Sequence, residues 1–287
     1  MTNGNILVLD VGGSFLKYGV ADEQGALLPG SVGEAPARAD ESPEKVYEAF
    51  GEVIRRAQET APLAGACACF PGPFDYTDGV FRMKHKFQAL YGCSILPPFE
   101  RAGLPVRFLH DSTSYILGEF SDGTLRGAED PCCVMLGTGL GFSMMKDGKV
   151  LIDQTQTPAL SLWCAPFREG IAEDYVSTRA IQAAYGQALS VKDIAGRARQ
   201  GDEQALRAFR LAGEALSELM GIIDRRFHPG KLALGGQIAR SADLLHLELP
   251  FPWEVSHHLD DAALRGAAYY ALHTREECTQ VLPKISL

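Results

Sequence analysis

The sequence has no excess of basic residues and no apolar run long enough to span a bilayer. Its 287 residues include 27 Lys and Arg against 36 Asp and Glu, a net charge of −9. This balance argues against a nucleic-acid-binding surface, because such a surface needs a basic stripe. A membrane-spanning helix requires about 20 apolar residues in succession, and no leader with a charged start and an apolar core precedes the first apolar segment at 5–9. We therefore expect a cytoplasmic protein with neither a nucleic-acid nor a membrane partner.

The cysteines are odd in number and scattered, which is typical of reduced thiols in a cytosolic protein. They stand at positions 67, 69, 93, 132, 133, 164 and 278. Cys67 and Cys69 would share one face of a strand, but no second pair with the spacing of metal ligands follows them. We interpret both as small buried hydrophobic residues, and the sequence predicts no structural zinc site.

Apolar periodicity and turn residues predict the same plan twice, a strand meander with a glycine turn followed by helices that cover the sheet. In the first half, strands are expected at 6–10, 15–21, 65–70 and 106–110, and helices at 42–61 and 112–120. In the second half, strands are expected at 132–136, 142–146, 149–152 and 231–234, and helices at 174–184, 191–199, 203–227 and 260–273. This plan is typical of two α/β lobes with a ligand between them.

Three glycine-rich turns, each next to an apolar strand, are the most informative pattern. They are Asp10-Val11-Gly12-Gly13-Ser14, Leu136-Gly137-Thr138-Gly139-Leu140-Gly141 and Leu234-Gly235-Gly236-Gln237. Glycine lets backbone N–H groups approach an anion without a Cβ in the way, and successive N–H groups in a turn form a concave anion site. Together the turns predict a chain folded around a polyphosphate. Taken singly, each is also explained as a tight turn or as close strand–helix packing.

Five motifs in this order resemble those of the ROK family of sugar kinases, within the actin–hexokinase superfamily. They are the phosphate motif at 10–17, Pro71-Gly72-Pro73, His110-Asp111-Ser112 with Leu117-Gly118-Glu119, the second phosphate motif at 136–141 and the adenosine motif at 229–236. The resemblance implies an α/β fold of two duplicated, ribonuclease H-like lobes, as in actin and hexokinase, with an interlobe cleft. It also implies an N-terminal lobe of residues 1–115 plus about 262–287, a C-terminal lobe of residues 116–261, and a homodimer.

The activity that the resemblance implies is phosphorylation of a hydroxyl on a hexose or related small carbohydrate, with ATP and Mg²⁺. The residues expected to bind the nucleotide are Asp10, Gly12, Gly13, Ser14, Gly137, Thr138, Gly139, Gly235 and Gly236. A carboxylate at Asp10 would repel phosphate unless Mg²⁺ lay between them, usually through water. The alternative role of Asp10 is to cap the turn.

Asp111 is the expected general base. It follows a strand and opens a helix, and from that position a carboxylate can orient a hydroxyl and accept its proton. The alternative is that Asp111 only caps the helix, because Asp is a preferred N-cap residue.

The acceptor side departs from the family pattern. His110 stands where the family has Asn before the catalytic Asp, and Lys86 lies in the segment that replaces a sugar-contacting Asn. Together with Gly72 and Glu173 they are the expected substrate contacts, although His110 and Lys86 are also explained as surface side chains and Glu173 as a residue of a helix first turn. An alternative function is therefore a non-catalytic carbohydrate- or nucleotide-binding sensor with the same fold.

The zinc cluster of the family should lie near residues 155–172, where Cys164 stands alone. A tetrahedral structural site needs four ligands, so we expect no zinc here. We expect apolar packing to anchor this loop in place of the metal. The side chains that would do so are Leu160, Leu162, Trp163 and Phe167. Trp163 is interpreted as a core residue, with a sugar platform as the alternative.

Overall fold

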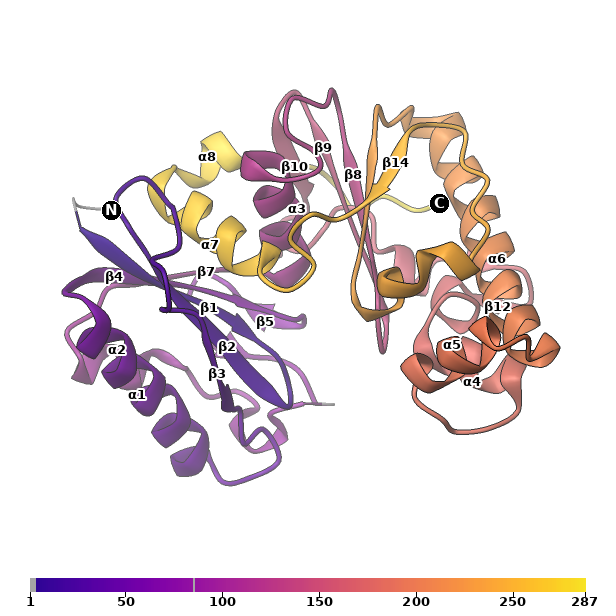
Figure 1. Cartoon of the computed structure of the whole chain (residues 1–287). Helices are drawn as coiled ribbons and strands as arrows, with labels where there is room; N and C mark the ends of the chain where they lie inside the picture. Colours follow the sequence, from indigo (N-terminus) through magenta and orange to yellow (C-terminus); the bar gives the residue numbers. More distant parts are fainter. Residues whose placement is uncertain (1–3, 85) are drawn as a thin grey trace.

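Two mixed β-sheets, each with its own helices, lie on either side of a helix pair formed by α3 (Asp111–Asp122) and α7 (Ala262–Leu272), as Figure 1 shows. This computed structural model describes residues 4–84 and 86–287. Within those ranges, no helix combines the length and the apolar character that a membrane crossing requires. The arrangement confirms the expected pair of α/β lobes.

The first sheet has the strand order β3-β2-β1-β4-β7. Its strands are β1 (Asn5–Val11), β2 (Phe15–Ala21), β3 (Gly33–Pro36), β4 (Leu63–Phe70) and β7 (Val106–His110). Helix α1 (Pro43–Thr60) packs on this sheet through the predicted apolar stripe, in which Val46, Phe50 and Val53 are fully buried. The elements β5 (Phe74–Asp75), β6 (Val80–Phe81), η1 (Gln88–Leu90) and α2 (Leu96–Arg101) connect β4 to β7. Since β4 and β7 are parallel with Phe70 opposite His110, the Pro71-Gly72-Pro73 turn begins beside Asp111.

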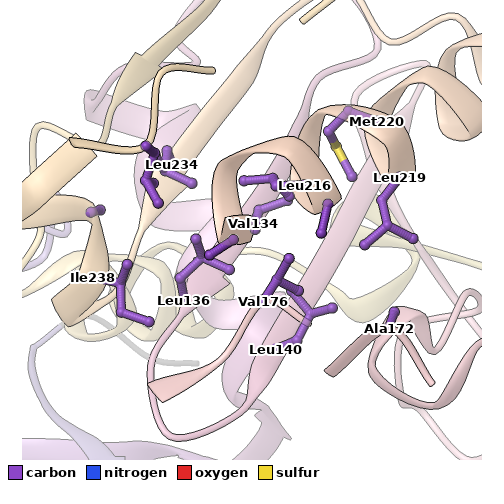
Figure 2. Packing of buried hydrophobic residues seen from close by; sticks show 14 of the residues in the cluster. Val134, Leu136, Leu140, Ala172, Val176, Leu216, Leu219, Met220, Leu234 and Ile238 are labelled. Atoms are coloured by element: carbon purple, nitrogen blue, oxygen red, sulfur yellow. The ribbon is translucent and has the colours of Figure 1, made fainter. Parts of the chain in front are cut away.

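The second sheet has the strand order β14-β13-β8-β9-β10-β15. Its strands are β8 (Cys132–Leu136), β9 (Leu140–Lys146), β10 (Lys149–Ile152), β13 (Leu232–Gly235), β14 (Trp253–Val255) and β15 (Thr279–Val281). Val134, Leu216 and Met220 belong to the core between this sheet and helix α6 (Glu203–Phe227), which Figure 2 shows from close by. The remaining elements are β11 (Pro166–Phe167), β12 (Gly170–Ile171), η2 (Leu162–Cys164), η3 (Ala172–Asp174), η4 (Gln237–Leu244), α4 (Thr178–Tyr185), α5 (Val191–Arg199) and α8 (Arg275–Cys278).

Helix α7 returns the chain to the first lobe, as predicted, and packs on β1 and β4. Its buried face includes Leu264, Ala267, Ala268 and Ala271. The following strand β15 pairs with β10, so the chain then crosses back to the second sheet. The lobe boundaries at residues 115 and about 262 stay a prediction, and the pairing of β15 favours placing the residues from 279 onward with the second lobe.

Helices α3 and α7 cross at glycines, which lets their backbones touch. A Cβ built on Gly118 would overlap the carbonyl group of Ala262, and a Cβ built on Gly266 would overlap the carbonyl group of Ser114. At the same crossing, the Ser114 hydroxyl donates a hydrogen bond of 2.6 Å to the Ala263 carbonyl oxygen. Neither backbone carbonyl can move aside without bending its helix, so the crossing requires glycine at both positions.

The crossing predicts that Gly266→Ala lowers the free energy of unfolding by about 1–3 kcal/mol or more, because the methyl group has no space. Gly51→Ala is the matched control, since Gly51 lies in helix α1 and a Cβ there meets nothing within 4 Å. The free energy of unfolding of that control should rise by about 0.5–1 kcal/mol, because alanine has a higher helix propensity than glycine. Urea denaturation of both variants measures the difference, and equal stabilities would contradict the close crossing.

Candidate active site

Asp111 is the first residue of α3 and immediately follows strand β7. Its side chain is 40% exposed, and Oδ1 accepts hydrogen bonds from the Ser112 backbone N–H at 2.5 Å and the Ser112 hydroxyl at 3.1 Å. These contacts end on Oδ1, which leaves Oδ2 without a hydrogen-bond partner among the residues that the structure describes. The N-cap residue of the helix is His110, and Asp111 lies at the first helical position, where its Oδ1 also accepts an N–H of the first turn.

His110 lies against the Asp111 carboxylate. Its Nδ1 is 3.0 Å from Asp111 Oδ1 and 3.1 Å from the Ser112 nitrogen. The Ser112 N–H donates to both neighbours, to His110 Nδ1 at 3.1 Å and to Asp111 Oδ1 at 2.5 Å. Burial raises the pKa of Asp111, but His110 and the hydrogen bonds from Ser112 outweigh burial and hold the pKa below its ordinary value. Asp111 is therefore anionic at neutral pH and able to accept a hydrogen bond or a proton.

Asp10 has the opposite environment on the neighbouring strand β1. Burial, and then the charge of Asp111, raise its pKa from 3.8 to about 6, while Cys69, Lys17 and Lys86 lower it. The Cys69 thiol donates to Asp10 Oδ1 at 3.5 Å. Two carboxylates that act on each other in a partly buried place fit a divalent cation, because the cation would relieve their repulsion. The role of Asp10 as a Mg²⁺-binding residue stays a prediction, with which this environment is compatible.

The first phosphate turn lies under Lys86. A Cβ built on Gly13 would be 3.1 Å from Lys86 Cδ and 3.3 Å from Lys86 Cγ, so the lysine stem rests on the glycine. Lys17, at the end of the same motif, points elsewhere, since its Nζ donates to the Asp260 carbonyl oxygen at 2.6 Å. The structure thus brings Lys86 to the predicted phosphate turn.

The second phosphate turn is held by Glu173. Glu173 Oε2 accepts the Leu140 backbone N–H at 2.9 Å, and Oε1 accepts from the Arg179 guanidinium at 2.8 Å. A Cβ built on Gly139 would lie only 2.6 Å from Oε2. Both carboxylate oxygens are therefore engaged, which favours a role in fixing the turn over the predicted contact with the acceptor. The expected helix start at 174 is wrong, because residues 172–174 form η3 and Ser177 caps α4 through the Ala180 N–H.

The adenosine motif has packing contacts at both of its glycines. A Cβ built on Gly235 would overlap the Tyr115 hydroxyl, and one on Gly236, whose φ is +81°, would overlap Leu136. These contacts match the alternative explanation of close strand–helix packing. The role of Gly235 and Gly236 beside adenosine stays a prediction.

At the predicted acceptor side, the turn at Gly72 lies near His110 and near a segment that the sequence analysis missed. A Cβ built on Gly72 would lie 3.5 Å from His110 Nε2 and 3.7 Å from Thr157 Cγ2. The buried Asp153 fixes this segment, since its carboxylate accepts from the Thr157 hydroxyl at 3.1 Å and the Thr157 N–H at 3.2 Å. The spacing of Asp153 and the two threonines, 155 and 157, is a turn signal, but nothing in it says which loop the turn faces.

The same segment also links the two lobes. The Gln156 amide donates a hydrogen bond of 2.8 Å to the Thr77 hydroxyl, which belongs to the loop between β5 and β6. Loops from both lobes thus meet beside Gly72, next to the predicted acceptor site.

The loop that carries zinc in the family is packed through apolar side chains. Leu160, Leu162 and Phe167 are buried as expected. The interpretation of Trp163 as a core residue is wrong: its side chain is 50% exposed, because η2 turns Leu162 inward and Trp163 outward. Cys164 is also exposed, and no cluster of three or more His, Cys, Asp or Glu suited to a metal occurs in residues 4–84 and 86–287.

Comparison with known proteins gives a consistent set of relatives. The family model described as ROK matches residues 6–274. The chain is 23% identical to a glucokinase of Thermotoga maritima over 270 residues, which cover 84% of each chain. It is 24% identical to the DNA-binding transcriptional repressor Mlc of Escherichia coli over 250 residues, 79% of this chain and 59% of the repressor.

A solved structure has the same fold. The crystal structure of a ROK family glucokinase from Streptomyces griseus, in complex with glucose and AMPPNP, matches with a TM-score of 0.75 at 21% identity and covers 93% of this chain and 98% of that one. The chain spans only 50% and 59% of the length of two of the curated relatives that it matches.

The raised pKa of Asp10 predicts that, in metal-free protein, Asp10→Asn increases the free energy of unfolding by an amount that depends on pH. Between its ordinary pKa of 3.8 and about 6, the folded state binds the proton more tightly, so the wild type loses stability as pH rises through this range. At about pH 8, Asp10→Asn should be more stable than the wild type by about 1–3 kcal/mol, and the gain should vanish near pH 4. Asp40→Asn, at an exposed aspartate, serves as the control and should show no such pH-dependent change in stability. Thermal melts in chelator measure both, and a less stable Asp10→Asn at pH 8 would contradict the environment described for Asp10.

The packing of the 160–167 loop predicts that the protein folds without zinc. Metal analysis of purified protein should find well under about one zinc per chain, because a structural site needs four ligands. A stoichiometric zinc whose removal by a chelator unfolds the chain would show this prediction to be wrong.

Proposed function

Because the chain belongs to the ROK family and has the two-lobed actin–hexokinase fold, we propose that it is a carbohydrate kinase that uses ATP and Mg²⁺ to phosphorylate a hydroxyl of a hexose or related sugar. The observation that carries the proposal is the Asp111 carboxylate. It is anionic, partly exposed, fixed at one oxygen, and close enough to Asp10 to raise the pKa of that residue. This is the arrangement that a general base beside a metal-binding carboxylate requires.

In the proposed mechanism, Asp111 Oδ2 accepts the proton of the acceptor hydroxyl while Oδ1 is held by Ser112 and His110. Asp10 would hold Mg²⁺ through water, and this ion would neutralise phosphate charge. Backbone N–H groups of the two phosphate turns would surround the phosphates. These residues are Gly12, Gly13, Ser14, Gly137, Thr138 and Gly139. Glu173 keeps the second turn in place, and Gly72 and His110 lie where the acceptor would bind.

Closure of the lobes belongs to the same proposal. The first phosphate turn follows β1 and the second lies between β8 and β9, so a nucleotide that touches both must touch both sheets. Contact with both turns would draw the lobes together and exclude water from the reacting hydroxyl. Assembly as a homodimer stays a prediction from the resemblance.

The second candidate is a sensor that binds ligand without catalysis. It is favoured by the approach of His110 and Thr157 to Gly72 at the predicted acceptor side, and by the engagement of both Glu173 oxygens, which leaves them less free to bind a sugar. An assay of ATP consumption over a panel of carbohydrates separates the candidates. Turnover with any member supports the kinase, whereas nucleotide binding with no turnover across the panel supports the sensor.

The proposed base predicts that Asp111→Asn lowers kcat by about 100-fold or more, while the affinity for Mg-ATP changes little. The amide keeps the shape of the side chain but cannot accept the proton. Asp147→Asn, an exposed position in the turn between β9 and β10, is the matched control and should keep its activity. An unchanged kcat in Asp111→Asn would remove this residue from the mechanism.

A further inference from the structure

Lys86 is held over the first phosphate turn by the residues around it. The next residue, Phe87, is fully buried, has a left-handed backbone with φ of 51°, and packs its ring against Phe81 at a centroid distance of 5.1 Å. This anchor fixes the chain on the C-terminal side of the lysine. The stem then lies along Gly13, with Cδ, Cγ and Cε at 3.1, 3.3 and 3.5 Å from where a Cβ would stand. The absence of a side chain at residue 13 is what makes room for the lysine.

The positive charges of Lys17 and Lys86 both lower the pKa of Asp10, at the end of the strand that leads into the turn, and Lys17 has the larger effect. Lys17 and Lys84 have further partners of their own. Lys17 donates to the Asp260 carbonyl oxygen and lies 3.6 Å from Glu34, and Lys84 lies over the Tyr91 ring at 4.9 Å from its centroid.

Different side chains approach the two glycines. The side-chain atoms nearest to a Cβ built on Gly72 belong to His110 and Thr157, whereas those nearest to a Cβ built on Gly13 belong to Lys86. A lysine ammonium is a compact charge with three donors on a flexible stem. Charge-assisted hydrogen bonds to phosphate are among the strongest that proteins make, and phosphoryl transfer is accelerated by fixed positive charge near the equatorial oxygens.

We propose that Lys86 is a further catalytic residue of this chain, which binds the terminal phosphate of the nucleotide donor against the Gly12-Gly13 turn and stabilises its charge during transfer. This role rests on the proposed kinase function and assigns Lys86 to the phosphate donor rather than to the sugar. Gly13 contributes both a backbone N–H to the turn and the open surface on which the lysine lies.

The test compares nucleotides that differ only in the terminal phosphate. Calorimetric titration of Lys86→Met with Mg-AMPPNP should show an affinity at least about tenfold lower than that of the wild type, because a charged hydrogen bond is lost. The affinity for Mg-ADP should stay within about twofold, since ADP lacks the phosphate that Lys86 binds. Lys86→Arg should recover part of the AMPPNP affinity, and Lys84→Met, two residues away, should match the wild type for both nucleotides.

Each other outcome overturns the assignment. An unchanged AMPPNP affinity in Lys86→Met, combined with a higher KM for the sugar, would place the lysine at the acceptor. An equal loss of affinity for ADP and AMPPNP, with a lower melting temperature, would make its role structural. A wild-type protein that binds neither nucleotide would overturn the proposed function itself, and the role of Lys86 with it. If the wild type binds both nucleotides, a negative result with the Lys86 variants overturns only the role of Lys86.

Discussion

The backbone contact between α3 and α7 is the constraint on which the arrangement of the site depends. At Gly118 and Gly266 the two helices approach until carbonyl oxygens occupy the space of a Cβ. Helix α3 packs on β8, β9 and β10 of the second sheet, and α7 packs on β1 and β4 of the first. A pair of helices in backbone contact thus joins two sheets that are otherwise connected through loops. Asp111 joins strand β7 of the first sheet directly to α3, so β7 sets its position relative to the first sheet and the packing of α3 sets its position relative to the second.

Glu119, the neighbour of Gly118, secures the other end of this arrangement. Its side chain is fully buried, and its oxygens accept the Thr124 N–H at 2.8 Å and the His258 N–H at 2.9 Å. One carboxylate therefore ties the loop that leaves α3 to the loop that leads into α7. Breaking such a pairing would leave buried donors and a buried charge without partners, which is costly. The Leu117-Gly118-Glu119 motif is explained by this structural role, and the proposed base Asp111 lies two turns earlier in the same helix.

Repeating patterns in the sequence predicted the fold well, and side-chain orientation in loops was predicted poorly. The stripe of α1 and the strands that flank the glycine turns follow from apolar periodicity, which encodes burial directly. The burial of Trp163 and the start of the helix beside Glu173 were predicted wrongly because both residues lie in short 3₁₀ turns, where no period distinguishes inside from outside. The Asp153–Thr157 segment was missed for a related reason. Its turn chemistry is local, whereas its importance comes from facing Gly72 and Thr77 on the other lobe.

His110 connects the two sides of the site in one side chain. Its Nδ1 faces the Asp111 carboxylate at 3.0 Å, and its Nε2 points toward Gly72 on the acceptor side. An asparagine, which the resemblance described above leads us to expect at this position, carries no ionisable group and could not hold the pKa of the adjacent carboxylate down in the same way. The pKa values of the two carboxylates therefore differ: that of Asp111 lies below its ordinary value, and that of Asp10 is raised to about 6. Such a separation assigns different roles to a pair of like groups. Because His110 faces both the Asp111 carboxylate and Gly72, a substitution at this position is expected to change the environment of the proposed base together with the predicted acceptor side.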